Sequence, residues 1–200
     1  VDLVIEAVSE SPKVKQKVFK SINNNIKPET IIASNTSALN ITELALNCNK
    51  PEKVLGMHFF NPAMIMKLVE LIKTEVTSEE TFKIARIFVE SLGKEAVEVK
   101  ESSGFIVNRV LIPMINEAAM IYEEGIASAE DIDKAMKLGA NHPIGPLALA
   151  DLIGIDVCQA IMETLSENLG SEKYKPASLL KKLIETGKLG KKSGEGFFKY

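Results

Sequence analysis

The chain has 200 residues, of which 46% are hydrophobic and 26% charged, which is the composition of an ordinary globular protein. Its formal net charge of -3 does not favour a nucleic acid as partner, and no apolar run is long enough to cross a bilayer. Cys48 and Cys158 lack CxxC spacing, so we expect no metal centre. Free thiols are typical of a reducing compartment, and we expect a cytoplasmic protein without a membrane partner.

The first hundred residues alternate between strand-like and helix-like patterns. Residues 1–8 form a nearly continuous apolar run, which is typical of a strand covered on both faces. Ser11 and Pro12 predict a helix start, as N-cap and first helical residue, and Pro28 predicts its end. This alternation indicates an α/β sheet with mainly parallel strands. The other expected elements are strands at 31–33, 54–59, 67–73 and 95–100 and helices at 42–46 and 78–92.

Beyond residue 100 nearly every segment has the pattern of a helix. The first of these helices contains Pro113, and the second is predicted to begin at Ser128, with Asp131 completing a capping box. We therefore predict two domains, an α/β domain over 1–101 and an all-α domain over 102–200. The expected helices are 104–124, one from 128, one long or two broken helices over 146–170, and 176–186.

Polar residues follow two of the predicted strands directly. Ser-Asn-Thr-Ser occupies 34–37, and His58 and Asn61 lie at the end of the strand over 54–59. The carboxyl ends of strands in open α/β sheets face the crevice that binds ligands. Histidine exchanges a proton near neutral pH, as a hydride-transfer reaction requires. The structural alternatives are a helix-capping turn and a core histidine beside two phenylalanines.

Glu70 lies inside the apolar run Lys-Leu-Val-Glu-Leu-Ile at 67–72. An unpaired carboxylate is costly to bury, so Glu70 either faces solvent or has a partner. If its face of the strand is buried, pairing with His58 is the least costly solution. A carboxylate in that position holds an imidazole in one tautomer and stabilises the imidazolium.

Two further segments place polar residues where packing does not require them. Asn108 and Arg109 begin the long helix, where an interdomain hydrogen bond and an exposed charge are the structural alternatives. The segment 190–200 is rich in glycine and lysine, so it either contacts phosphates or forms a solvated tail. The sequence has no Walker-type loop and no GxSxG elbow, which argues against nucleotide hydrolysis and against a serine hydrolase.

Taken in order, these motifs resemble those of the L-3-hydroxyacyl-CoA dehydrogenase family. The resemblance covers essentially the whole chain, and it implies the C-terminal part of a Rossmann-type NAD-binding domain followed by a helical domain for substrate binding and dimerisation. We therefore expect a homodimer. The matching segments are Ser-Asn-Thr-Ser, His-Phe-Phe-Asn-Pro, Lys-Leu-Val-Glu, Gly-Phe-Ile-Val-Asn-Arg, Lys-Leu-Gly-Ala, His-Pro-Ile-Gly-Pro and Gly-Lys-Lys-Ser-Gly-Glu-Gly-Phe.

The resemblance also implies roles for individual residues. It places the family's catalytic His-Glu pair on His58 and Glu70, with His58 taking the hydroxyl proton as hydride leaves for NAD⁺. It assigns Ser37 and Asn108 to hydrogen bonds with the 3-oxygen and thioester region of the substrate. The positions implied near the cofactor are Glu10, Lys15, Ser37, Asn61 and Lys192.

The family's front βαβ unit, with Gly-x-Gly-x-x-Gly and a following acidic residue, has no counterpart in this sequence. Residues 1–8 would be the fourth strand of the family's sheet, so on the order of 80–90 residues are expected to be missing before it. We expect NAD as the cofactor and leave NADP open, because the residues that choose between them lie in the missing unit. We also expect weak NAD(H) binding and little activity from this chain alone.

The expected reaction is the reversible oxidation of an (S)-3-hydroxyacyl-CoA to the 3-oxoacyl-CoA, with 3-hydroxybutyryl-CoA as substrate and acetoacetyl-CoA as product. The alternatives are a non-catalytic dimeric relative, like a lens crystallin, and a segment of a larger fatty-acid oxidation polypeptide. The four matching catalytic positions argue against the first, and the ending Phe-Phe-Lys-Tyr argues against the second. The residues expected at a subunit interface are Ile112, Ile115, Ala118, Ala119 and Ile121, with the stretch 146–155.

Overall fold

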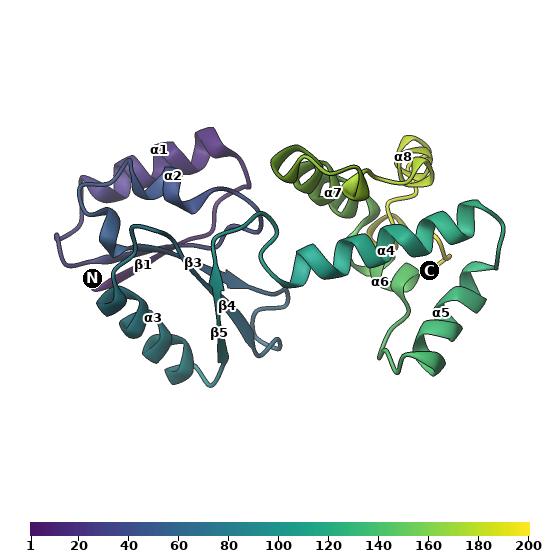
Figure 1. Ribbon diagram of the computed structural model, residues 1–200, viewed down its shortest axis with the longest axis horizontal. Coiled ribbons are helices and arrows are strands. Elements are labelled where there is room, and N and C mark those ends of the chain that lie inside the picture. Colours follow the sequence, from purple (N-terminus) through teal and green to yellow (C-terminus); the bar gives the residue numbers. More distant parts are fainter. The chain divides into compact units, whose positions relative to one another are not determined.

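The computed structural model describes all residues from Val1 to Tyr200 and divides them into two compact units. The first unit is Val1–Phe105 and the second is Ile106–Tyr200, whereas the sequence pattern predicts the division after residue 101. The first unit is an α/β structure and the second consists of helices (Figure 1), so the predicted fold class is confirmed.

The first unit is built on one five-stranded sheet. Most predicted elements are present, with ends that differ from the prediction by a few residues. The strand predicted over 1–8 is shorter, because the sheet pairs only four of its residues. The elements are β1 (Leu3–Glu6), α1 (Pro12–Asn23), β2 (Ile31–Ser34), α2 (Ile41–Ala45), the 3₁₀ turn η1 (Pro51–Lys53), β3 (Val54–Phe59), β4 (Leu68–Lys73), α3 (Glu79–Ser91) and β5 (Glu95–Lys100).

The strands lie in the order β1-β2-β3-β4-β5. The pairs β1–β2, β2–β3 and β4–β5 are parallel, as predicted for most of the sheet, and β3–β4 is antiparallel. Only residues 60–67 connect β3 to β4. A parallel pair needs a crossover of about a dozen residues or more, so this short connection requires the antiparallel pairing.

Helices cover both faces of the sheet (Figure 1). Phe19 of α1 packs with Ile32 in the core beneath α1 and α2. Ile31 and Ala33 face the opposite way and pack with Phe82 of α3. Successive side chains of a strand point to opposite faces, so both faces of β2 are buried. This double burial explains the nearly continuous apolar runs in the sequence.

Serine side chains begin two of the helices as the sequence predicts. Ser78 Oγ accepts a hydrogen bond from the backbone of Thr81 at the start of α3. Ser128 Oγ accepts the Asp131 N–H and donates to the Asp131 carboxylate, which is a variant of the capping box because the hydroxyl rather than the backbone N–H of Ser128 contacts that carboxylate. Ser11 occupies the N-cap position of α1, but its side chain makes no capping hydrogen bond.

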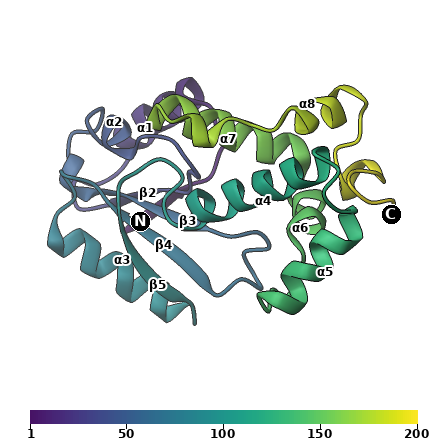
Figure 2. The ribbon, with the colours of Figure 1, turned by 45° about the vertical axis from the view of Figure 1, so that its right-hand side comes forward.

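The second unit is entirely helical, and α4 contacts α5, α6, α7 and α8 within it (Figures 1 and 2). The segment 146–170 forms two helices that break at Gly154, whose φ of 107° few other residues adopt. None of the helices combines the length and apolar character that a membrane span requires. The elements are α4 (Val107–Glu123), α5 (Ala129–Gly139), α6 (Pro146–Ile153), α7 (Ile155–Leu169), the 3₁₀ turn η2 (Glu172–Tyr174), α8 (Ser178–Glu185) and the 3₁₀ turn η3 (Lys191–Ser193).

The predicted subunit interface is wrong for four of its residues. Ile112, Ile115, Ala118 and Ala119 are all at most 5% exposed in the single chain. They pack against α5, α6, α7 and α8 and form the core of the second unit. A helical stripe of apolar residues does not reveal whether it packs within its own chain or against a partner, and here it packs within its own chain.

The C-terminal segment 190–200 is folded, so the solvated tail, one of the two alternatives for this segment, is wrong. The buried Asp151 carboxylate accepts the backbone N–H groups of Phe197 and Phe198, each at 2.9 Å, and the Tyr200 hydroxyl at 3.2 Å. A Cβ at Gly190 would overlap the Asp151 backbone, so this close approach requires glycine. Burial raises the pKa of Asp151, and burial together with that carboxylate raises the pKa of Tyr200 to about 12.

The two cysteines are expected to differ in their reaction with N-ethylmaleimide. Burial, with the nearby Asp156 and Asp151 carboxylates, raises the pKa of the Cys158 thiol to about 12, and Cys158 is fully buried. Burial also raises the pKa of Cys48, which is half-buried. Because the thiolate is the reacting species, the native chain should gain at most one adduct near neutral pH and two in guanidinium. Intact mass spectrometry counts the adducts, and rapid double labelling of the native chain would contradict this expectation.

Candidate active site

His58 and Glu70 lie directly opposite each other in the antiparallel pair β3–β4. Side chains of directly opposed residues project from the same face of a sheet, which brings these two together. His58 Nδ1 is 2.7 Å from Glu70 Oε2, and both side chains are at most 5% exposed. An ionised carboxylate only accepts hydrogen bonds, so Nδ1 carries the hydrogen and Nε2 is left to exchange a proton.

Two aromatic rings flank the imidazole of His58. The Phe60 ring lies 4.6 Å and the Phe105 ring 5.5 Å from the imidazole, centroid to centroid. On its remaining side, His58 Nε2 is 3.2 Å from the Ser37 hydroxyl. The histidine is therefore buried among phenylalanines, as the structural alternative expects, and yet its second nitrogen faces a polar group rather than an apolar wall.

Ser37 belongs to the loop that follows β2, and a carboxylate holds that loop in place. Glu10 Oε1 accepts hydrogen bonds from Thr36 Oγ1 at 2.5 Å, from Ser37 N at 2.8 Å and from Ala38 N at 3.2 Å. Thr36 Oγ1 in turn accepts the backbone N–H of Leu39 at 3.0 Å. The position of the Ser37 hydroxyl therefore depends on a side chain from the segment between β1 and α1.

A buried ion pair lies behind this loop. Lys15 Nζ is 2.8 and 3.1 Å from the two carboxylate oxygens of Glu6, and neither side chain is exposed. Glu6 also accepts hydrogen bonds from Ser34 Oγ at 2.7 Å and from Val8 N at 2.6 Å. Lys15 Nζ is 3.4 Å from Glu10 Oε2. The ammonium that the resemblance places near the cofactor is thus enclosed by protein groups.

Two further residues organise this site: Glu6 was not singled out from the sequence, and Asn35 was noted only as part of the segment 34–37. Glu6 is a carboxylate in an apolar strand, the same signal that drew attention to Glu70. Asn35 Oδ1 accepts the backbone N–H of Phe59 at 2.8 Å and so joins the ends of β2 and β3. Asn61, predicted near the cofactor, is exposed in the loop after β3.

The remaining predicted residues lie in the second unit. Asn108 is partly buried in the first turn of α4. Arg109 Nε donates to the Tyr174 hydroxyl at 3.3 Å, and this hydrogen bond is the main cause that lowers the pKa of Tyr174. Lys192 Nζ pairs with the Asp156 carboxylate at 2.6 and 2.7 Å, so its charge is balanced within its own unit.

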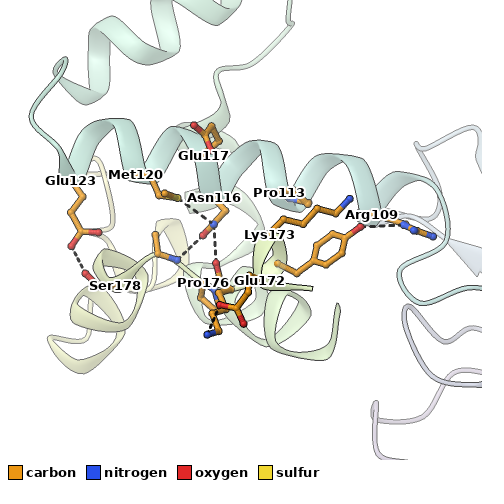
Figure 3. A pocket seen from close by; sticks show the side chains of 13 residues that line it. Arg109, Pro113, Asn116, Glu117, Met120, Glu123, Glu172, Lys173, Pro176 and Ser178 are labelled. Carbon is orange, nitrogen blue, oxygen red and sulfur yellow. Dashed lines mark hydrogen bonds and ion pairs between the residues drawn. The ribbon is translucent and has the colours of Figure 1, made fainter. Parts of the chain in front are cut away.

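A cavity of about 610 Å³ lies beside α4 in the second unit (Figure 3). Arg109 and Tyr174 are among the residues that line it. The Asn116 side chain donates to Lys175 O at 3.1 Å and accepts from Ala177 N at 2.7 Å, which fixes the segment between η2 and α8. None of the residues predicted to be catalytic lines this cavity, and Asn116 serves a structural purpose there.

The polar side chains that follow the carboxyl ends of β1, β2 and β3 fit one end of a dinucleotide. Glu10, Ser37 and Asn61 offer a carboxylate, a hydroxyl and an amide at this edge, and each is partly or fully exposed. Open α/β sheets bind nucleotides at such an edge. These groups match the uncharged amide and ribose hydroxyls of a nicotinamide nucleoside, whereas residues 1–105 contain no glycine-rich loop for its pyrophosphate.

Comparison with protein families identifies the family of this chain. Residues 1–102 match the family model described as 3-hydroxyacyl-CoA dehydrogenase, NAD binding domain, and residues 104–200 match 3-hydroxyacyl-CoA dehydrogenase, C-terminal domain. The chain belongs to the 3-hydroxyacyl-CoA dehydrogenase family. The family predicted from the ordered motifs, the Rossmann-type first domain, NAD and an oxidoreductase are thereby confirmed.

Individual 3-hydroxyacyl-CoA dehydrogenases match along the whole chain. A probable 3-hydroxybutyryl-CoA dehydrogenase of Bacillus subtilis is 54% identical over 199 residues, which is 100% of this chain and 69% of the relative. A 3-hydroxybutyryl-CoA dehydrogenase of Clostridioides difficile is 52% identical, over 100% of this chain and 71% of the relative. The crystal structure of (S)-3-hydroxybutyryl-CoA dehydrogenase from Ralstonia eutropha superimposes with a TM-score of 0.97 at 48% identity, covering 100% of this chain and 70% of that one.

Proposed function

We propose that this member of the family interconverts (S)-3-hydroxybutyryl-CoA and acetoacetyl-CoA, with His58 as the general acid and base. The observation that carries the proposal is the line Ser37–His58–Glu70, with contacts of 3.2 Å at Nε2 and 2.7 Å at Nδ1. The named substrates of the similar dehydrogenases support a four-carbon acyl group.

In the oxidation direction, His58 Nε2 accepts the proton of the substrate's 3-hydroxyl while the C3 hydrogen leaves with its electron pair. NAD, when bound, supplies the two-electron acceptor for that hydrogen. Glu70 holds the Nδ1–H and stabilises the imidazolium that forms, because the pair is almost fully withdrawn from water. In the reverse direction C3 gains a hydrogen together with its electron pair, and the imidazolium returns its proton to the oxygen.

The other predicted residues have supporting roles in this proposal. The Ser37 hydroxyl donates to the substrate's 3-oxygen, where charge develops during the reaction. Asn108 of the second unit binds the same oxygen or the thioester region. Glu10, Ser37 and Asn61 would hold the nicotinamide end of the cofactor, and Lys192 contributes only if it exchanges Asp156 for a cofactor group.

We also propose that the helical unit forms a homodimer. Although four of its predicted interface residues are buried, large apolar side chains stay exposed in the single chain, among them Val110, Ile126, Leu138 and Leu152, and Leu152 belongs to the predicted stretch 146–155. Most closed assemblies of identical chains are two-fold dimers. Sedimentation velocity should give a mass of about 44 kDa, which is twice 21.9 kDa, and a single species of the monomer mass at micromolar concentration would contradict the dimer.

Loss of NADH absorbance with acetoacetyl-CoA tests the proposed reaction. The assay compares this chain with the longest open-reading-frame product that contains it, and each is also given a long-chain 3-oxoacyl-CoA. The proposal expects turnover by the open-reading-frame product, with a higher kcat/KM for acetoacetyl-CoA than for the long-chain thioester. Absence of turnover on both sides of neutral pH would instead favour the non-catalytic relative.

A further inference from the structure

One carboxylate connects two parts of the first unit that are distant in the sequence. Glu10 Oε1 holds Thr36, Ser37 and Ala38 of the loop after β2 through three hydrogen bonds. Its second oxygen, Oε2, lies 3.4 Å from Lys15 Nζ. The Glu10 side chain is 40% exposed, so it spans the distance between a buried cation and the surface.

Lys15 is itself fixed from behind. Its side chain is 0% exposed, and its ammonium contacts both oxygens of Glu6 and the Val8 carbonyl oxygen at 3.3 Å. Glu6 has further donors in Ser34 Oγ and Val8 N. Neither charge can turn away without leaving the other buried and uncompensated, which is strongly unfavourable. Glu10 Oε2 therefore lies against a cation that is buried and paired with Glu6.

The loop that Glu10 holds carries the hydroxyl that contacts the imidazole, since Ser37 Oγ is 3.2 Å from His58 Nε2. We propose that Glu10 is a positioning residue for Ser37, and that the Glu6–Lys15 pair holds Glu10 in place for this purpose. The inference rests on the proposed function. It assigns Glu10, Glu6 and Lys15 to the orientation of the Ser37 hydroxyl. That hydroxyl contacts His58 Nε2, the nitrogen proposed to exchange a proton with the substrate.

This role differs from that of a cofactor ligand in a measurable way. A residue that only binds the cofactor changes the surroundings of the His58 ring when the cofactor is present and leaves them unchanged in the free chain. A residue that positions Ser37 affects the surroundings of His58 in the free chain as well. The test is therefore made without cofactor or substrate.

The measurement is the NMR signal of the histidine rings. The chain contains only two histidines, and His142 lies in the second unit, where it serves as an internal reference. Ser37→Ala sets the size of the His58 shift that loss of the hydroxyl contact produces. Glu10→Gln should shift the His58 signals in the same direction and by at least half as much. The double variant, Glu10→Gln with Ser37→Ala, should shift the His58 signals no further than Ser37→Ala alone. The His142 signals should stay unchanged in all variants.

The matched control is Glu29→Gln, which neutralises an exposed carboxylate of the same unit and should move neither histidine. The proposal is overturned if Glu10→Gln leaves His58 at its wild-type position, if Ser37→Ala itself does not move His58, or if Glu29→Gln moves it equally. If Glu10→Gln does not give the wild-type far-UV circular dichroism, Glu10→Asp takes its place with the same expectations. That variant keeps the charge beside Lys15 but withdraws the carboxylate from the loop by one methylene. Failure of the proposed reaction would appear separately, as absent turnover by the wild-type protein.

Discussion

Replacing His58 with glutamine should lower kcat for acetoacetyl-CoA reduction by about 10²–10⁴-fold, which is the usual contribution of a general acid or base. Glutamine can donate a hydrogen bond to Glu70, which is 2.7 Å from His58 Nδ1, but it cannot transfer a proton at Nε2. The change is measured as initial rates of NADH oxidation at saturating substrate, together with the thermal unfolding midpoint.

The other histidine provides the control for this variant. His142→Gln alters a residue of the second unit to which the proposal assigns no role, and it should leave kcat within about twofold of wild type. If His58 had only a structural role, its replacement would lower the unfolding midpoint while the remaining folded protein turned over normally. That outcome would show that His58 does not transfer the proton in the reaction.

Replacing Lys15 with methionine should lower the free energy of unfolding of the first unit by about 3–5 kcal/mol. The variant leaves Glu6 buried without its cation, since the two side chains contact each other at 2.8 Å with no exposure. Glu6→Gln with Lys15→Met removes both charges and should cost much less than Lys15→Met alone. The expected difference follows from the energy of an uncompensated buried charge rather than from lost packing.

The positions of the tyrosines allow the unfolding of the first unit to be separated from that of the second. All three tyrosines, Tyr122, Tyr174 and Tyr200, lie in the second unit, and the chain has no tryptophan. Urea unfolding followed by tyrosine fluorescence therefore reports the second unit, while far-UV circular dichroism reports both. Lys17→Met on the exposed side of α1 is the matched control and should change stability by less than about 0.5 kcal/mol. If Lys15→Met and Lys17→Met lowered the free energy of unfolding equally, the buried Lys15 would stabilise the first unit no more than an exposed lysine does.

From the sequence, His58 was the expected partner of Glu70 only if that face of the strand was buried, and the geometry of the pair was not predicted. A carboxylate inside an apolar strand requires either solvent or a partner, and pairing with His58 was the least costly solution for a buried face. Their direct opposition depends on the antiparallel register of β3 and β4, which follows from the short connection between them. The same reasoning applied to Glu6 would have predicted a second buried partner, although only the fold identifies it as Lys15.

The errors in the helical unit have a common physical origin. An apolar stripe such as that of Ile112 and Ile115 indicates burial, but it does not distinguish burial in the same chain from burial against another. The glycine-rich C-terminal segment has the composition of a mobile tail, yet Asp151 of α6 accepts three of its donors. Long-range contacts of this kind depend on how the helices pack, which local sequence patterns do not encode.

The most direct test of the proposed reaction follows the transferred hydrogen. Acetoacetyl-CoA is reduced by the longest open-reading-frame product that contains this chain, with NADH that carries deuterium at the transferable position of C4, and the thioester product is analysed by mass spectrometry and by chiral chromatography. The proposal predicts (S)-3-hydroxybutyryl-CoA with one deuterium at C3, and it predicts that the His58→Gln variant forms this product only at the residual rate. Unlabelled product, the opposite configuration, or undiminished formation by the variant would contradict the account.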